Sequence, residues 1–448
     1  MGLGAVLEPL VVLTLLFGGT YVNRNRGYKL RLRHLTTTRS KRTTHGRDVE
    51  DLPSSPGSFA SDDPLIPASQ PCSPSLLAVD HVAPWREREL RLWGFKTVVR
   101  TPNSRQFKDR WFARVLRKFP FLQEAFYWAL IYWVYQLGRA FTALTLVSST
   151  VDVARQHALQ LIRFEQQLGI FWEVPIQRFF LSYPAAMHWI NRIYSFIHIP
   201  GTILFLVWLY YHTTTRNRIF ERAQGLEVTK INASPAGPRL YEARRRTMAM
   251  CNLLAFIVFT FWPCMPPRLL SDPDVPGAEG ELARSFGFVD TVHSAKGESS
   301  VWTQNRFCNQ YAAMPSLHFG YSLLVGLTVM TIPLPPHKKG KTTISLKGSR
   351  ISIPIPSWRR ATCMTVGFLY PFTILVAIVA TANHFILDAV AGAMVCGLAW
   401  HGNDVLLNLL PLEDWFLFCL RTHFPEKDVV EHSEGQESAK LVAKGLVQ

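Results

Sequence analysis

Seven apolar segments, each about the length of a membrane-spanning helix, constrain the fold of this chain more than any other feature. A helix needs roughly 20 predominantly apolar residues to cross the hydrocarbon core of a bilayer. Windows of this kind occur near residues 3–22, 121–148, 186–211, 248–266, 316–335, 361–382 and 385–410. We therefore predict an all-α fold, a polytopic transmembrane helical bundle with six core helices plus an N-terminal signal anchor.

The anchor is expected over residues 1–22. A cleaved signal peptide would carry basic residues before its apolar stretch, whereas here the basic residues come after it. This order favours a retained transmembrane anchor.

Positive charge is concentrated in three loops between the apolar segments. Loops 23–47, 213–247 and 336–360 carry nine, eight and seven Lys or Arg residues, the last with no acid. The positive-inside rule places these loops in the cytosol, with the N-terminus outside and the C-terminal tail inside. Topology and contact with anionic lipid explain the net charge of +16 better than nucleic-acid binding does, so no nucleic-acid partner is expected.

Composition divides the rest of the chain. Residues 23–83 are basic and then rich in Ser, Pro and Asp, which predicts a disordered cytosolic linker. Residues 84–120 mix Trp, Phe and Leu with Arg and Lys, which suits amphipathic helices on the cytosolic membrane face. Residues 121–410 hold the transmembrane domain, and residues 411–448 are expected to be a mobile cytosolic tail.

The loop between the second and third apolar segments is predicted to carry an amphipathic helix on the outer face. Apolar residues recur there at helical spacing, with Arg155, Arg163, Glu165 and Glu173 on the opposite side. A helix in this position would cover the outer side of the bundle.

Seven cysteines show neither a CxxC pair nor metal-ligand spacing with His, so we expect no structural zinc. Cys264 and Cys308 both fall on the predicted outer side, where an oxidising compartment would allow a bridge. Two free thiols are the favoured alternative.

Two histidines stand at the mouths of apolar segments, where an ionisable ring needs an explanation. His318 lies in NQYAAMPSLHFGYSLLVG, and His384 lies in ATANHFILDAVAG. The predicted topology brings both, together with Arg268 of FWPCMPPRLL, to the outer membrane surface. Asp388 follows His384 by four residues, so its carboxylate can hold the imidazole N–H and fix the tautomer.

These side chains have the chemistry of a phosphate site with a nucleophile. Arg268 offers a planar fork of donors to a phosphoryl group, and Ser316 at a helix start can hold further oxygens. One histidine can attack phosphorus while the other protonates the leaving oxygen, so neither a metal nor a cofactor is expected.

A packing role is the competing interpretation of polar residues in membrane segments. It is favoured for His198 and Arg192, in the apolar segment 186–211. It is less favoured where several polar residues converge at one depth on one side. A non-catalytic membrane scaffold therefore remains an alternative.

Three motifs resemble those of the type 2 phosphatidic acid phosphatase superfamily. PPRLL resembles the first, AAMPSLHFG the second and TANHFILDAVAG the third, within residues 121–410. The residues of these motifs are most similar to those of the fungal and bacterial inositolphosphotransferase branch, which contains inositol phosphorylceramide synthases. The resemblance implies a catalytic domain with His384 as the nucleophile, Asp388 as its partner and His318 as the general acid. It also implies that Arg268 and Ser316 bind phosphate.

The chain departs from the family pattern at two phosphate ligands. The lysine of the first motif would fall at Phe261, and the arginine of the third motif at Ile378. Leu269 follows Arg268 at the position where the first motif of the superfamily has Pro. Asn383 precedes His384 where inositol phosphorylceramide synthases carry a His-His pair.

The resemblance thus implies an integral membrane phosphotransferase acting on a lipid phosphate or phosphoinositol lipid through a phosphohistidine. Head-group transfer to a sphingolipid or phospholipid is one outcome, and release of phosphate to water by a lipid phosphate phosphatase is the alternative. The active site would face the lumen or the cell exterior of a multi-pass protein, with Golgi or endoplasmic reticulum favoured. The sequence leaves the head group, the acceptor and the oligomeric state open.

Overall fold

The computed structural model describes residues 4–30, 83–92, 94–145, 148–223, 235–291, 310–335, 341–346, 349–354 and 356–424. Helices dominate these residues, which confirms the predicted helical class, and two β-hairpins are added to them. The main helices are α1 (Gly4–Val22), α2 (Trp111–Lys118), α3 (Phe121–Thr145), α4 (Ser148–Leu168), α5 (Glu173–Leu181), α6 (Pro184–Arg192), α7 (His198–Tyr210), α8 (Arg216–Ala223), α9 (Pro238–Phe261), α10 (Gly277–Ser285), α11 (Leu317–Thr331), α12 (Trp358–Ala380), α13 (Ile386–Gly402) and α14 (Leu410–Cys419).

Two helical stretches among the described residues are long and apolar enough to cross a membrane. They are Pro184–Ile219, which joins α6, α7 and part of α8, and Trp358–Ala380, which is α12. Pro9–Val22 and Leu317–Thr331 are shorter apolar helices. The six-helix core and the signal anchor therefore stay predictions.

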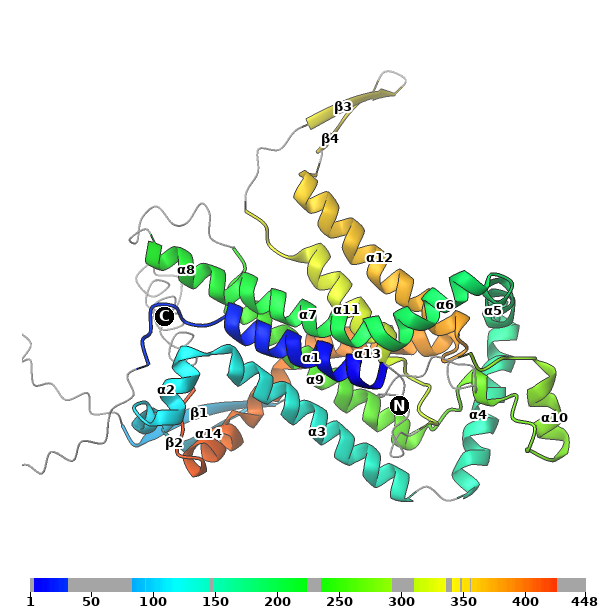
Figure 1. Ribbon diagram of the computed structural model, residues 1–448, viewed down its shortest axis with the longest axis horizontal. Coiled ribbons are helices and arrows are strands. Elements are labelled where there is room, and N and C mark those ends of the chain that lie inside the picture. The colour runs from blue at the N-terminus through cyan, green and yellow to red at the C-terminus, as the bar shows by residue number, and fades with distance from the viewer. Residues whose placement is uncertain are drawn as a thin grey trace, which may run out of the picture.

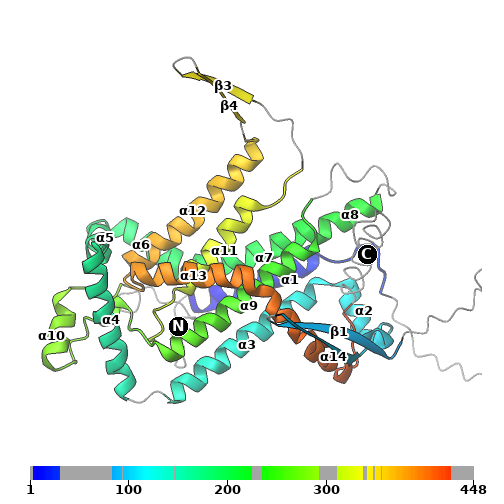
Figure 2. The ribbon, with the colours of Figure 1, turned by 180° about the vertical axis from the view of Figure 1, so that it is seen from behind.

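The molecule is elongated and has two distinct ends (Figures 1 and 2). α4, α5 and α10 lie at one end, which we call the α4 end, whereas α2, α14 and the first β-hairpin lie at the other. α3, α7 and α9 run between the two ends. Their buried core includes Phe121, Leu209 and Cys251.

Glycines bring the helices of this core close together. A Cβ on Gly326 of α11 would meet the carbonyl oxygen of Gly367 of α12 at 2.3 Å. A Cβ on Gly392 of α13 would meet the carbonyl oxygen of Ser316, just before α11, at 2.3 Å. Since real side chains do not approach backbone so closely, glycine is required for α11 to lie against both neighbours.

The prediction of helices over 84–120 is wrong for its first half. Residues 85–102 form an antiparallel hairpin of β1 (Trp85–Leu92) and β2 (Phe95–Pro102). Gly94, with φ +90°, supplies the left-handed turn between the strands. Exposure alternates along β1, where Arg86, Arg88 and Leu90 are half-buried between exposed neighbours, which is the two-residue period of a strand. β2 is rich in Val and Thr, which favour strands.

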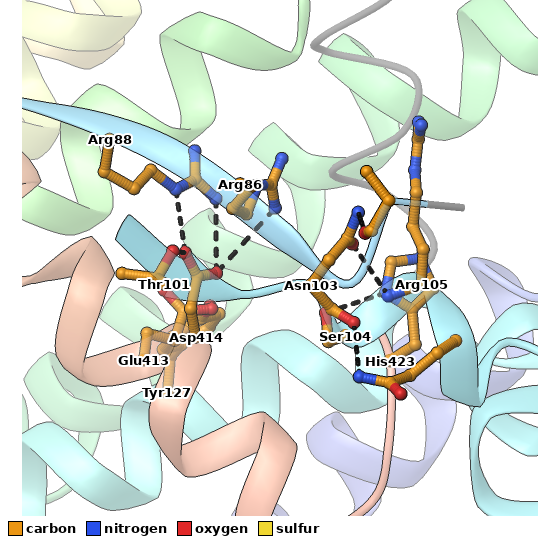
Figure 3. Close-up of polar contacts among 12 residues, drawn as sticks. Arg86, Arg88, Thr101, Asn103, Ser104, Arg105, Tyr127, Glu413, Asp414 and His423 are labelled. Carbon is orange, nitrogen blue, oxygen red and sulfur yellow. Dashed lines mark hydrogen bonds and ion pairs between the residues drawn. The ribbon is translucent and has the colours of Figure 1, made fainter. Parts of the chain in front are cut away.

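The prediction of a mobile tail from residue 411 is wrong for its first part. α14 occupies Leu410–Cys419 and packs on the hairpin, with Asp414 fully buried. The Asp414 carboxylate accepts hydrogen bonds from Arg88 at 2.8 and 3.2 Å and from Thr101 at 2.9 Å, and Arg86 lies 3.8 Å away (Figure 3). Residues 425–448 lie outside the described residues.

Three further predictions concern segments that the structure describes only in part. Loop 336–360 contains a second hairpin that the sequence did not predict, β3 (Lys341–Leu346) with β4 (Ser349–Pro354). Most of linker 23–83 lies outside the described residues. Cys264 is a buried free thiol, whereas its proposed partner Cys308 also lies outside them.

Candidate active site

Three separate segments meet at the α4 end of the molecule. Backbone hydrogen bonds join the turn after α9 to the α12–α13 turn, from Arg268 N–H to the Ala382 carbonyl at 2.8 Å. The start of α11 is joined to α13 by a bond of 2.9 Å from Ser316 N–H to the Asp388 carbonyl. The three motifs PPRLL, AAMPSLHFG and TANHFILDAVAG therefore lie in one region, as the predicted topology requires.

His384 is presented by a tight turn between α12 and α13. Ala382 adopts φ +52° although it carries a side chain, and it is fully buried. The N–H groups of Asn383 and His384 both donate to the carbonyl oxygen of Ile378, at 3.0 and 3.2 Å. A left-handed non-glycine residue is strained, and such strain persists where surrounding contacts hold it, often beside functional groups.

A backbone carbonyl determines which nitrogen of His384 carries the proton. The Nδ1 atom lies 2.8 Å from the carbonyl oxygen of Ala313. A carbonyl oxygen can only accept, so Nδ1 must be protonated. The Nε2 atom of the neutral ring then carries the lone pair, which is the form a nucleophile needs.

Asp388 lies beside this ring but makes its shortest contact elsewhere. Its Oδ2 atom is 3.5 Å from His384 Nδ1 and accepts a hydrogen bond of 2.9 Å from the N–H of Phe385. The carboxylate is fully buried. It is therefore placed to stabilise positive charge on the ring and to cap α13, while Ala313 fixes the tautomer.

His318 faces His384 from the first turn of α11. The two ring centroids are 5.6 Å apart. The rings of Tyr194 and His198 also lie against His318, with centroids 4.8 and 5.2 Å from that of His318. They come from a π-helical turn at Ile193–Ile197 and the residue after it, a local widening of the helix that is frequent at functional sites.

His198 is buried and hydrogen-bonds through Nδ1 to the Tyr370 hydroxyl at 3.1 Å. These contacts fit the packing role favoured from the sequence, but its ring also touches His318. The sequence does not reveal that contact, because His198 and His318 lie on different segments.

Arg268 and Ser316, the expected phosphate ligands, are both engaged in protein contacts. The Arg268 Nε atom donates to Asn383 Oδ1 at 3.0 Å, and its Nη1 atom donates to Asp290 Oδ2 at 3.1 Å. The Ser316 hydroxyl caps α11 by accepting from Phe319 N–H at 3.4 Å. Arg268 has further N–H groups that could bind an oxyanion, whereas the Ser316 hydroxyl serves mainly to start the helix that carries His318.

The two departures from the family pattern place no cation at the site. Phe261, in the position of the motif lysine, is 81% exposed at the end of α9. Ile378, in the position of the motif arginine, is fully buried in an apolar cluster and contributes only its carbonyl to the His384 turn.

Glu165 and Glu173 lie at this site, contrary to their predicted place on the outer polar face. Both are fully buried and bond to the start of α13. Amphipathic spacing predicts a solvated face for such residues, so sequence reasoning missed them. Within the described ranges, no group of three or more His, Cys, Asp or Glu side chains is arranged to hold a metal ion.

Comparison with known proteins identifies the family. No curated protein and no solved structure matches the chain. The family model described as the PAP2 superfamily matches residues 159–231, 233–335 and 354–401, together half of the chain. These ranges include His318, His384, Asp388 and Arg268, and the last of them ends within α13. The chain therefore belongs to the PAP2 superfamily, the type 2 phosphatidic acid phosphatases and related phosphotransferases whose motifs it resembles.

Proposed function

We propose that this protein is an integral membrane phosphotransferase that moves a phosphate-containing group between lipids through a phosphohistidine on His384. Membership of the PAP2 superfamily supports a phosphatase-type enzyme associated with membranes. The observation that carries the proposal is the pairing of His384, whose Nδ1 atom contacts the Ala313 carbonyl, with His318, at a distance of 5.6 Å between ring centroids.

In the first step, Nε2 of His384 attacks phosphorus and the bond from phosphorus to the leaving oxygen breaks. His318, as an imidazolium, donates its proton to that oxygen. The phosphorylated His384 ring keeps its Nδ1 proton and becomes cationic, so the Asp388 carboxylate 3.5 Å away stabilises the intermediate. Arg268 holds the remaining phosphoryl oxygens.

In the second step, an acceptor hydroxyl attacks phosphorus and the P–N bond breaks. The neutral His318 ring takes the proton of the acceptor, which restores both rings. This course routes no step through a metal ion, so we expect activity to persist in a chelator such as EDTA.

The nature of the acceptor separates transferase from phosphatase. An alcohol on inositol or a sphingoid lipid gives transfer, in line with the resemblance to the inositolphosphotransferase branch. Water gives hydrolysis. Release of free phosphate from a lipid phosphate without any added alcohol would favour the phosphatase.

The decisive experiment is to trap the intermediate. Purified protein is mixed with radiolabelled lipid phosphates and phosphoinositol lipids and quenched in alkali, with His384→Ala and His318→Ala alongside. We expect an acid-labile label that is absent in His384→Ala. In His318→Ala the label should form slowly, most slowly with a donor that has a basic leaving group. A folded protein that takes no label from any donor would favour a scaffold instead.

The predicted orientation, with the site facing the lumen or the cell exterior, forms part of this proposal. The α4 end holds the site, and the opposite end holds the basic segments near α8 and the start of α9. A cysteine placed at exposed Glu281 of α10 should react with a membrane-impermeant maleimide from the lumenal or outer side. Labelling from the cytosolic side alone would reverse the orientation.

A further inference from the structure

The first turn of α13 is held by three carboxyl groups from three helices. Phe385 N–H donates to Asp388 at 2.9 Å, Ile386 N–H to Glu173 Oε1 at 2.8 Å and Leu387 N–H to Glu165 Oε1 at 2.8 Å. The first N–H groups of a helix have no partner within it, and they attract negative charge. Each of these three N–H groups, which directly follow His384, is thus bound by a carboxyl oxygen.

Two of these carboxyl groups come from distant parts of the chain. Glu165 lies near the end of α4 and Glu173 at the start of α5, more than 200 residues before the amides that they bind. A residue next to α13 in the sequence could cap this helix without either glutamate. Together they fix the start of α13, and with it the turn that carries His384, against α4 and α5.

The three carboxyl groups at the start of α13 cannot all be ionised at once. Glu165 and Glu173 are fully buried and bind the neighbouring amides of Ile386 and Leu387, so two ionised carboxylates there would repel each other. The Oε2 atom of each glutamate is buried and has no hydrogen-bond partner in the described part of the chain. One proton between the two groups satisfies both oxygens.

Burial, and next the charge of Glu173, raises the pKa of Glu165 to about 9, against the hydrogen bond from Leu387 N–H, with Asp388 adding a smaller upward effect. Burial likewise raises the pKa of Glu173. The other titratable groups that face the pair are Asp388 of α13 and the thiol of Cys264, after α9. The pair therefore keeps its proton at neutral pH.

We propose that Glu165 and Glu173 act as a proton-sharing pair of positioning residues that holds the start of α13 and thereby aims His384 at its substrate. The proposal rests on the proposed function, because the residue that is positioned is its nucleophile. Loss of the shared proton would set two adjacent carboxylates and Asp388 against one another, and the first turn of α13 would shift. Removal of a purely structural cap would lower the stability of the protein. It would not make the orientation of His384 depend on the loss of one proton.

Substitution by glutamine separates the proton from the hydrogen bonds. Glu165→Gln keeps an oxygen for Leu387 N–H and presents a fixed N–H to Glu173, which mimics the protonated pair. Glu165→Ala removes both the oxygen that Leu387 N–H binds and the group that faces Glu173. Glu281→Gln is the matched control, because Glu281 is an exposed glutamate on α10.

The first measurement follows kcat/KM of the full-length protein between pH 6 and 10 with the donor that labels His384. A group with a pKa of about 9 retains its proton in about a quarter of molecules at pH 9.5. Glu165→Gln should therefore lose about fourfold less activity than the wild type between neutral pH and pH 9.5, and Glu281→Gln should follow the wild type. An alkaline fall of equal size in Glu165→Gln would overturn the proposal.

The second measurement needs no activity. Hydrogen exchange of the peptide covering 385–390 in the full-length protein, corrected for intrinsic rates, should show protection that the wild type loses between pH 7 and 9.5 and Glu165→Gln keeps. If no donor labels His384 while this pattern is seen, the proposed function fails and the proton-sharing pair stands. Equal protection of both proteins at both pH values would sink the pair itself, even if labelling succeeded.

Discussion

His384 donates its Nδ1 proton to the carbonyl oxygen of Ala313 over 2.8 Å, a shorter contact than the 3.5 Å between the same nitrogen and Asp388. The backbone before α11 thus determines the tautomer of a ring that follows α12. This arrangement differs from a Ser-His-Asp triad, where the carboxylate alone orients the imidazole. A contact with a carbonyl oxygen also cannot be removed by substituting one side chain.

The first prediction concerns Asp388→Asn. Loss of a tautomer-setting carboxylate costs about 10⁴-fold in kcat in serine proteases. Here Ala313 keeps the tautomer, and Asp388→Asn should lower kcat by only about 10- to 100-fold, through weaker stabilisation of the cationic phosphohistidine. Rapid-quench kinetics of label formation would measure this. A loss as complete as that of His384→Ala would show that the carboxylate sets the tautomer after all.

The second prediction concerns the contact of α13 with the start of α11. Alanine at Gly392 would place its Cβ 2.3 Å from the carbonyl oxygen of Ser316, so the two helices must separate. We expect a destabilisation of about 1–3 kcal/mol, together with a lower kcat because His318 and His384 move apart. Thermal unfolding and turnover would be measured together.

Gly397 provides a matched control for Gly392 on the same helix. It has nothing within 4 Å of its would-be Cβ. Gly397→Ala should therefore leave turnover unchanged and raise stability slightly, through the better helix propensity of alanine. Equal effects of the two substitutions would mean that the close approach does not align the histidines.

The convergence of the three motifs could be predicted from the sequence because apolar length and loop charge together imply which segment ends share a side. The i to i+4 spacing likewise placed Asp388 near His384. The Ala313 carbonyl could not be predicted, since any residue can supply a backbone oxygen. Glu165 and Glu173 were misplaced for a different reason. A glutamate opposite an apolar stripe normally faces water, and only the meeting of α4, α5 and α13 buries these two.

The hairpin at residues 85–102 shows a second limit. Aromatic, leucine and arginine residues suit an amphipathic helix at a membrane, and composition alone favoured that interpretation. The Val and Thr residues of FKTVVRTP were the contrary signal, because β-branched residues favour strands. What stabilises the strands is remote in sequence, because the buried carboxylate of Asp414 binds Arg88 and Thr101.

The third prediction follows from that carboxylate. Asp414→Asn removes the charge that offsets Arg88 and Arg86, whose side chains are 16% and 15% exposed. Breaking a buried ion pair by removing one partner costs about 3 kcal/mol or more. We expect the hairpin and α14 to become sensitive to limited proteolysis while His384 is still labelled, because the site lies at the opposite end of the molecule (Figure 1). Loss of labelling in a protein whose core helices remain folded would contradict this independence.

The fourth prediction concerns Arg268 and Asp290, which are joined by a hydrogen bond of 3.1 Å. Arg268 is 9% exposed and Asp290 is 23% exposed, so this contact lies at the rim of the site. A phosphoryl group that approaches the guanidinium must share it with a carboxylate, and two anions beside one cation repel each other. Asp290→Asn removes that repulsion while it keeps a hydrogen-bond acceptor.

Asp290→Asn should therefore bind vanadate several-fold more tightly than the wild type, as measured by inhibition of turnover. Arg268→Lys keeps the charge but loses the planar fork and the bond from Nε to Asn383. It should weaken the binding of vanadate by about tenfold or more. If Arg268→Lys leaves vanadate inhibition unchanged, the phosphoryl group is held by other donors and Arg268 serves to fix the His384 turn. In that case the Arg268 N–H bond to Ala382 and the Arg268 Nε bond to Asn383 would be its main contribution to the site.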